Sequence, residues 1–301
     1  MMCMPHVVLA AAVTLLLPCS AGARGESSDT GRVSGGITVH TVVRGESLAR
    51  IGSTFGVDAA TLAAENHLDP RAPLAVGQRI WIDNRHIVPE EASAGGIVIN
   101  IPQRMLFYAD EGRLEASPVA VGRPDWQTPT APFTVITKKQ NPTWHVPASI
   151  LRESARRGRT QPPVVPPGPG NPLGDYWIGL SVSGIGIHGT PAPARIYNAA
   201  THGCIRLGSA GIRRLFTLVD VGVQGQIIYE PILLAEIHGE VYLEVHKDVY
   251  GRLNVEPMQM LHRLAVDAAL ADRIDWTVAD AVLGARQGVA RVVTKEPKEH
   301  R

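Results

Sequence analysis

The chain has 301 residues, of which 45% are hydrophobic and 19% charged, and its 29 lysines and arginines nearly balance 28 aspartates and glutamates. This composition is typical of a globular protein and excludes wholesale disorder. The small net charge provides no strong basic field, so we expect no nucleic-acid partner. Three cysteines without a CxxC pair exclude a disulfide framework and indicate no structural metal site.

The N-terminus carries a short apolar run, residues 7–17, followed by small residues at Ala21 and Ala23. This run is too short to span a bilayer, which needs about 20 residues. We therefore predict a signal peptide over residues 1–23, although no Lys or Arg precedes the apolar run; the alternative is a buried N-terminal helix. Cleavage would remove Cys3 and Cys19. No later run reaches spanning length, so we expect no transmembrane helix in the mature chain.

Residues 24–36 are rich in Gly and Ser and predict a linker. A compact unit follows over residues 38–83. It opens with alternation typical of a strand, and Ser47 is a candidate N-cap for a helix that ends at Gly56. Asp58 is expected to cap a second short helix, and a turn and a strand close the unit. The pattern predicts a small βααβ module.

This module resembles a LysM domain. The matching segments are residues 40–48 (HTVVRGESL), 55–57 (FGV) and 76–80 (VGQRI), together with Ile51, Leu62 and Asn66. The resemblance implies binding of N-acetylglucosamine-containing glycan, here peptidoglycan. A spacer without ligand affinity is the alternative.

The middle of the chain follows a short linker, residues 89–96, and has the pattern of a sandwich or barrel of short strands. The predicted strands are residues 97–101, 105–108, 133–137, 176–180 and 226–229. Residues 161–172 hold six of the 23 prolines, so we expect neither a ladder nor a helix there. This stretch is either a functional loop beside a cleft or a rigid connector. Nearby arginines, most simply a solvated helix face, are Arg152, Arg156, Arg157 and Arg159.

Cys204 is the one cysteine left after the predicted cleavage. A lone thiol in an oxidising compartment is either buried and inert or retained as a nucleophile. Gly203 lets a substrate approach the backbone closely, and the N–H groups of Gly203 and Cys204 are candidates for an oxyanion hole. His188 ends an apolar run; taken alone, it is more simply explained as a structural histidine.

Together these residues resemble the YkuD-type L,D-transpeptidase motif. Its two parts are residues 188–190 (HGT) and residues 201–206 (THGCIR). The resemblance covers residues 97–230 and implies a mainly β catalytic domain, a YkuD-like β-sandwich. The order of signal, LysM, catalytic domain and C-terminal extension resembles the periplasmic ErfK/YbiS group. Some members of that group attach the Braun lipoprotein to peptidoglycan, and others form 3→3 cross-links.

The resemblance implies acyl transfer through a Cys204 thioester without a cofactor. His188 would take the thiol proton, oriented by the carbonyl of Gly189. The substrate would be a peptidoglycan tetrapeptide stem, and the partner a second stem or a Braun-type lipoprotein. Arg206 would hold a substrate carboxylate or else bond to nearby backbone. The remaining expected substrate-binding residues are His202, Thr201, Thr190 and Trp144, of which Thr201 is also expected to support the loop.

Residues 231–301 form an extension without a chemical motif. Residues 241–245 predict a strand, residues 258–265 have helical spacing, and residues 280–287 suit another short helix, which together indicate an α+β unit. Residues 295–301 are expected to fray.

Three other functions compete with transpeptidation. A thiol hydrolase with water as acceptor would trim tetrapeptides or release a lipoprotein. A non-catalytic wall-binding protein would rely on the LysM module alone, against which the intact Cys204, His188 and Arg206 argue. Metal binding by His188, His202 and Cys204 matches no zinc spacing, so we predict no metal site.

Overall fold

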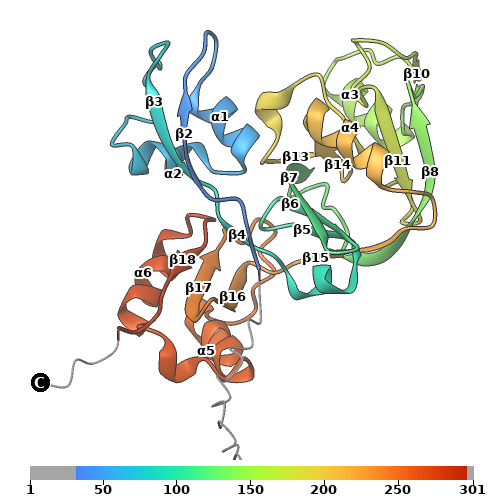
Figure 1. The fold of residues 1–301 in the computed structure, drawn as a ribbon. Coiled ribbons are helices and arrows are strands. Elements are labelled where there is room, and N and C mark those ends of the chain that lie inside the picture. The colour runs from blue at the N-terminus through green and yellow to red at the C-terminus, as the bar shows by residue number, and fades with distance from the viewer. Residues whose placement is uncertain (1–31, 297–301) are drawn as a thin grey trace, which may run out of the picture.

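The computed structural model describes residues 32–296 (Figure 1). The predicted signal peptide, with Cys3 and Cys19, lies outside the described residues, as do residues 297–301 of the predicted frayed tail. Within residues 32–296, no helix is long and apolar enough to cross a membrane. Figure 1 shows an N-terminal module beside a larger mainly β domain, with a C-terminal unit below both.

The N-terminal module is a two-stranded sheet with two helices. Its elements are β2 (Ile37–Thr41), α1 (Leu48–Phe55), α2 (Ala59–Glu65) and β3 (Arg79–Asp83). β2 and β3 pair antiparallel, with Val39 opposite Trp81. Alternate side chains of β3 point inward, so Ile80 and Ile82 are buried with Ile51 and Leu62 of the helices.

Local side-chain chemistry sets the ends of the first helix. The Ser47 hydroxyl accepts a hydrogen bond from the Arg50 N–H at 3.3 Å, and Gly56 ends α1 with a left-handed φ of 76°. The predicted Asp58 cap is wrong in its chemistry. Asp58 precedes α2, but its carboxylate bonds both terminal nitrogens of Arg104, at 3.0 and 3.2 Å, instead of the helix N–H groups.

Both predicted linkers contain ordered structure. In the first, β1 (Val33–Ser34) pairs antiparallel with β4 (His86–Ile87), so residues 32–36 are not a plain linker. In the second, a 3₁₀ helix, η1 (Glu90–Ala94), leads into the central domain. The first feature was not visible from composition because β1 depends on a partner strand far away in the sequence.

Nine strands of the described chain form the central sheet. They are β5 (Gly96–Asn100), β6 (Met105–Asp110), β7 (Arg113–Gly122), β8 (Ala131–Gln140), β11 (Tyr176–Leu180), β12 (Gly186–His188), β13 (Ala199–Thr201), β14 (Ile205–Leu207) and β15 (Gln224–Ile228). Their spatial order is β13-β7-β14-β12-β11-β8-β15-β5-β6, and β6 also pairs with β7.

This extra pairing closes the sheet into a barrel-like ring, which corrects the expected β-sandwich. β7 is ten residues long and reaches both sides of the closure: residues 113–118 pair with β6, and residues 119–120 with β14. The interior is filled by buried aliphatic residues such as Ile99, Val119 and Ile178. Helix α4 (Ser209–Leu218) packs on this core through its buried apolar side chains.

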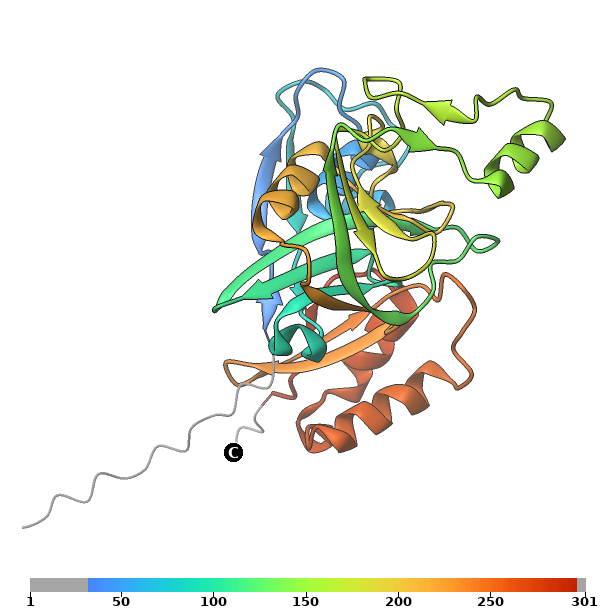
Figure 2. The same ribbon diagram turned by 90° about the vertical axis from the view of Figure 1, so that its right-hand side faces the viewer.

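A long insertion, residues 141–175, separates β8 from β11, and we call it the flap. It contains β9 (Trp144–His145), α3 (Ala148–Arg156) and β10 (Val164–Val165), and Figure 2 shows it projecting from the barrel. The expectation that residues 161–172 form no ladder is wrong, because β10 pairs antiparallel with β9. The two valines stand between proline pairs and retain their own N–H groups.

The C-terminal unit is a three-stranded antiparallel sheet covered by helices. Its elements are β16 (Ile232–Ile237), β17 (Glu240–Val245), β18 (Arg291–Val292), α5 (Pro257–Asp267), η3 (Ala271–Arg273) and α6 (Trp276–Ala285). α6 begins earlier than the predicted helix because the Asp275 carboxylate caps the N–H groups of Thr277 and Val278. Another short 3₁₀ helix, η2 (Pro193–Arg195), belongs to the central domain.

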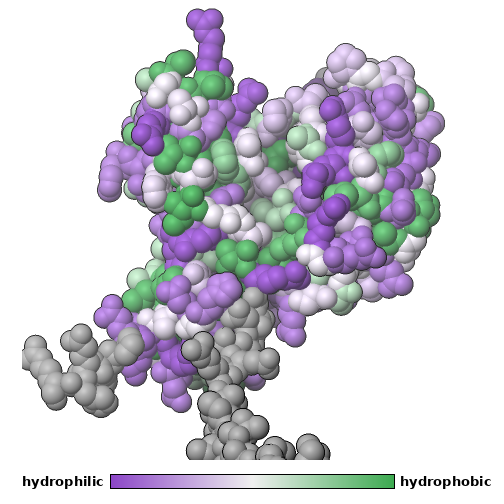
Figure 3. Space-filling model, viewed as in Figure 1, coloured by the Kyte–Doolittle hydropathy of each residue, from purple (hydrophilic) through white to green (hydrophobic). Residues whose placement is uncertain are grey.

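The N-terminal module is docked directly onto its neighbours. The buried Arg104 guanidinium binds Asp58 and lies over the Tyr197 ring at 4.0 Å, and the Ser53 hydroxyl donates to Ile196 O at 2.8 Å. Val289, from the C-terminal unit, completes the hydrophobic core of the module. In the space-filling view, the N-terminal module and the central domain are in contact at their inner ends, and a notch separates their outer ends (Figure 3).

Candidate active site

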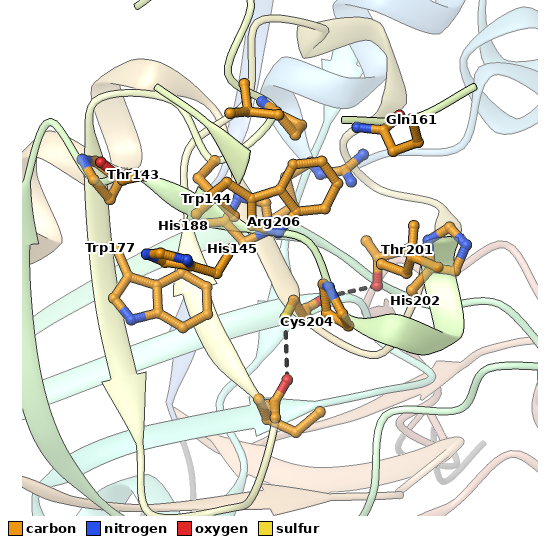
Figure 4. A pocket seen from close by; sticks show the side chains of 18 of the residues that line it. Thr143, Trp144, His145, Gln161, Trp177, His188, Thr201, His202, Cys204 and Arg206 are labelled. Atoms are coloured by element: carbon orange, nitrogen blue, oxygen red, sulfur yellow. Dashed lines mark hydrogen bonds between the residues drawn. The ribbon is translucent and has the colours of Figure 1, made fainter. Parts of the chain in front are cut away.

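A cavity of about 840 Å³ lies between the flap and the barrel. Cys204, His188 and Arg206 line it, together with Trp177 from β11 and Trp144 from the flap (Figure 4). β12 and β14 are parallel neighbours, with His188 opposite Arg206. This register explains why residues separated in sequence meet at one end of the barrel.

Cys204 is half-buried in the bend that leads into β14 and is the only cysteine among residues 32–296. Its thiol lies 3.6 Å from the carbonyl of Gly184, to which it donates a hydrogen bond. Burial raises the pKa of this thiol above its ordinary value, although the charge of Arg206 acts in the opposite direction. The resting side chain is therefore a neutral thiol near pH 7.

The bend before Cys204 is held by hydroxyl groups. Thr201 Oγ1 donates to Cys204 O at 2.6 Å and accepts from Gly203 N at 3.1 Å, while Thr128 Oγ1 donates to Gly203 O at 2.8 Å. Gly203 has a φ of 106°, which strains any other residue. The Gly203 N–H is thus already paired, which corrects the expectation that both N–H groups serve an oxyanion hole. Thr201 borders the cavity, but its hydroxyl braces the loop.

His188 is buried, with 3% of its surface exposed, and its Nδ1 lies 2.6 Å from Gly189 O. A carbonyl only accepts, so Nδ1 carries the proton and Nε2 is the basic nitrogen. Burial lowers the pKa of His188 to about 3, helped by the charge of Arg206, while hydrogen bonds to carbonyls act in the opposite direction. The ring of Trp177 stacks on the imidazole with centroids 5.9 Å apart.

Arg206 projects from β14 into the cavity, and its Nε is buried without a hydrogen-bond partner among the described residues. Burial lowers the pKa of its guanidinium. Of the two roles expected for Arg206, a bond to nearby backbone through Nε is not present. The unsatisfied donor instead favours a ligand that supplies an acceptor.

His202 lines the cavity beside the flap. Its Nε2 lies 2.5 Å from Glu153 of α3, and its ring meets that of Trp126 edge-on at 4.8 Å. Trp144 forms part of the flap wall of the cavity. Thr190 is not brought to this cavity: it is buried, its hydroxyl accepts from Ala192 N at 3.1 Å, and it borders a separate small pocket.

The YkuD family, described as the L,D-transpeptidase catalytic domain, matches residues 94–228, and the LysM domain family matches residues 40–83. The probable L,D-transpeptidase YcfS of Escherichia coli K12 is 33% identical over 294 residues, covering 93% of this chain and 91% of YcfS. The chain belongs to the L,D-transpeptidase family.

Two further relatives from Escherichia coli K12 match shorter regions. The probable L,D-transpeptidase ErfK/SrfK is 37% identical over 57% of this chain and 56% of its own length. The probable L,D-transpeptidase YbiS is 32% identical over 71% of this chain and 72% of its own length.

Sequence reasoning missed several residues of this L,D-transpeptidase cavity. Trp177 stood within a predicted strand without a motif, yet it packs so closely that a Cβ on Gly186 would lie 2.3 Å from its ring. Glu153 stood among four arginines that were interpreted as a solvated face. Its helical spacing to Arg157, i to i+4, was the available signal, but its partners Arg123 and His202 are remote in sequence.

A buried cluster of potential metal ligands was also missed, away from the cavity. His86, Glu244 and His246 are each at most 2% exposed, and one carboxylate oxygen of Glu244 lies 2.8 Å from His86 Nδ1 and 2.7 Å from His246 Nε2. Around zinc, tetrahedral ligand atoms stand about 3.3 Å apart, given bonds of about 2.0 Å. These contacts have hydrogen-bond lengths, and His86 Nε2 also donates to Gly56 O at 2.9 Å. We interpret the cluster as a polar junction between modules.

Proposed function

We propose that this protein is a periplasmic L,D-transpeptidase that transfers an acyl group from a peptidoglycan tetrapeptide stem through a Cys204 thioester. The products are 3→3 cross-links or a Braun-type lipoprotein attached to the wall. One observation carries the proposal: a thiol and an imidazole oriented by a backbone carbonyl line a single cavity beneath the flap. Membership of the family and the predicted export signal support the compartment and the substrate class.

The first step is proton transfer from the Cys204 thiol to His188. Both groups are neutral at rest, because burial raises the pKa of the thiol and lowers the pKa of the imidazole. The thiol must turn from Gly184 O toward Nε2 of His188 as the substrate enters. The hydrogen bond from Nδ1 to Gly189 O holds the ring and stabilises the imidazolium that forms.

The thiolate then attacks the carbonyl carbon between meso-diaminopimelate and the terminal D-Ala. The C–N bond breaks, the D-Ala amine leaves with the proton held by His188, and the acyl group remains on sulfur as a thioester. Since Gly203 N–H is occupied by Thr201, the Cys204 N–H is the backbone donor that we assign to the developing oxyanion.

Arg206 is the residue that we assign to a carboxylate of the stem. Its partly buried guanidinium has an unpaired Nε, and it is held opposite His188 by the strand register. A guanidinium–carboxylate pair is directional, so it would fix the donor stem relative to Cys204.

Attack by an amine breaks the thioester and restores the Cys204 thiol. The amine of a second stem attacks the thioester carbonyl, sulfur leaves as the thiolate, and the amine proton passes through His188 to sulfur. A lysine amine of a lipoprotein would react in the same way, whereas water would release a tripeptide. The LysM module is proposed to hold the glycan that carries the stems.

The decisive experiment incubates the purified mature protein with a disaccharide-tetrapeptide, with and without an added amine acceptor, and resolves products by mass spectrometry. We expect cross-linked dimer and released D-Ala from the wild type, no product from Cys204→Ala, and normal product from Glu115→Gln, a surface control. A separate assay offers a lipoprotein C-terminal peptide as acceptor. Tripeptide alone would identify a carboxypeptidase. Absence of both products and of carbapenem acylation at Cys204 would refute the proposal.

A further inference from the structure

The flap is fastened to the barrel by a carboxylate next to the reactive loop. Glu153 is the only buried residue of α3, which otherwise presents exposed or half-buried side chains. Its partners come from two segments of the barrel: Arg123 follows β7, and His202 stands two residues before Cys204. The contact therefore joins the flap, which lines one side of the cavity, to the segment that carries the thiol.

The carboxylate receives charged or polar donors on both oxygens. Oε2 lies 2.5 Å from His202 Nε2, Oε1 accepts from Arg123 Nη2, and Oε1 also forms a salt bridge with Arg157 Nη2 at 2.8 Å. These hydrogen bonds, first that of His202 and then that of Arg123, lower the pKa of Glu153 to about 2. The group is thus a carboxylate throughout the physiological range.

His202 and Arg123 depend on this carboxylate to stay together. Arg123 Nη1 lies 3.2 Å from His202 Nε2, the same nitrogen that faces Glu153. A carboxylate only accepts, so Nε2 carries a proton, and two N–H donors then face each other across 3.2 Å. Without Glu153 the imidazole and the guanidinium lose the anion that compensates them, and His202 is free to turn away.

A shift of His202 would act directly on the reactive loop. The backbone N–H of Arg123 donates to Thr201 O at 3.1 Å, and Thr201 Oγ1 braces both Gly203 and Cys204. The loop is therefore held at Thr201 by the backbone of Arg123 and at His202 by the contact of its side chain with Glu153.

We propose that Glu153 is a positioning residue for the nucleophile: from the flap, its carboxylate holds His202 and Arg123 together and so orders the loop of residues 201–204. The inference rests on the proposed role of Cys204. It couples the docking of the flap on the barrel to the alignment of the thiol.

The test compares Glu153→Ala, the nearly isosteric Glu153→Gln and the charge-retaining Glu153→Asp with a matched control, Glu115→Gln. Glu115 also pairs with an arginine, Arg214, but on the exposed surface. Two quantities are measured: hydrogen–deuterium exchange of peptides covering residues 148–157 and 200–206, and the binding and acylation constants of a carbapenem at Cys204. A melting temperature equal to that of the wild type establishes that each variant is folded.

We expect faster exchange in both peptides of Glu153→Ala and Glu153→Gln, and an acylation rate constant about 10- to 100-fold lower, as for a reacting group displaced by about 1 Å. The carbapenem dissociation constant should change less, and Glu153→Asp should retain more activity than Glu153→Gln. Faster exchange in the flap peptide alone, with an unchanged acylation rate constant, would overturn the inference. If the wild type is not acylated at all, the proposed function fails, while the exchange of residues 200–206 still decides the role of Glu153.

Discussion

The protonation state of His188 makes a measurable contribution to stability. The folded protein keeps this imidazole neutral because burial lowers its pKa to about 3. In the unfolded chain the imidazole takes up a proton at a pKa near 6.5. Stability from His188 is therefore complete above about pH 6.5 and is lost progressively as the pH falls toward about 3.

The size of the effect follows from these two values. Between pH 7 and pH 5, protonation of His188 stabilises the unfolded state but not the folded state. This difference lowers the unfolding free energy by about 2 kcal/mol through His188 alone. His188→Asn removes this titration, so its unfolding free energy should fall by about 2 kcal/mol less than that of the wild type over the same range. Other titrating groups contribute equally to both proteins.

Urea unfolding followed by circular dichroism at pH 7, 6 and 5 measures the difference. His67→Asn, which replaces an exposed histidine of the N-terminal module, serves as the control and should follow the wild type. Equal pH dependence in the wild type and His188→Asn would mean that folded His188 titrates with the same pKa as in the unfolded chain, near 6.5. Burial would then not keep the imidazole neutral below about pH 6.5, and the lowered pKa described above would be incorrect.

Three further predictions follow from the structure. Alkylation of Cys204 by iodoacetamide should accelerate up to and beyond pH 9, because burial raises the pKa of the thiol; a rate plateau below pH 7 would contradict this. Gly186→Ala should lower stability by about 1–3 kcal/mol and slow acylation, since its Cβ would meet the Trp177 ring at 2.3 Å; unchanged melting and acylation would show that the ring moves without cost. Asp58→Asn should lower the unfolding free energy by about 3 kcal/mol by leaving the Arg104 guanidinium buried without its anion, and a midpoint equal to that of the wild type would show that the docking contact contributes little.

Local structure could be predicted from the sequence where it depends only on residues within one element. Ser47 and Gly56 mark the ends of α1 because a cap acts over three or four residues. Cys204 and His188 were predicted as site residues from the resemblance to the family motif, and the structure brings both to one cavity. The strand pattern was compatible with a sandwich or a barrel, and it could not decide between them, because closure depends on β7 pairing with strands on both sides.

The parts of the site that stayed hidden depend on partners distant in the sequence. Glu153 and Arg123 are ordinary surface residue types, and only the folded chain brings them to His202. Asp58 had the correct position for a helix cap, but a buried guanidinium competed for its carboxylate. The polar junction around Glu244 brings together Gly56 of the N-terminal module, His86 of β4 and Glu244 of the C-terminal unit, so no window of sequence contains it.

Under the proposed function, the docking of the N-terminal module limits how the protein can sample its substrate. A binding domain on a flexible tether raises the effective concentration of every site within reach of the linker. Here the module is fixed by Arg104 and by a core shared with Val289, and 3₁₀ helix η1 stands in place of a loose connection. A glycan strand held as proposed would therefore be presented to Cys204 at one distance and one angle. The spacing of stems along that strand, rather than the length of a tether, would then select which stem reacts.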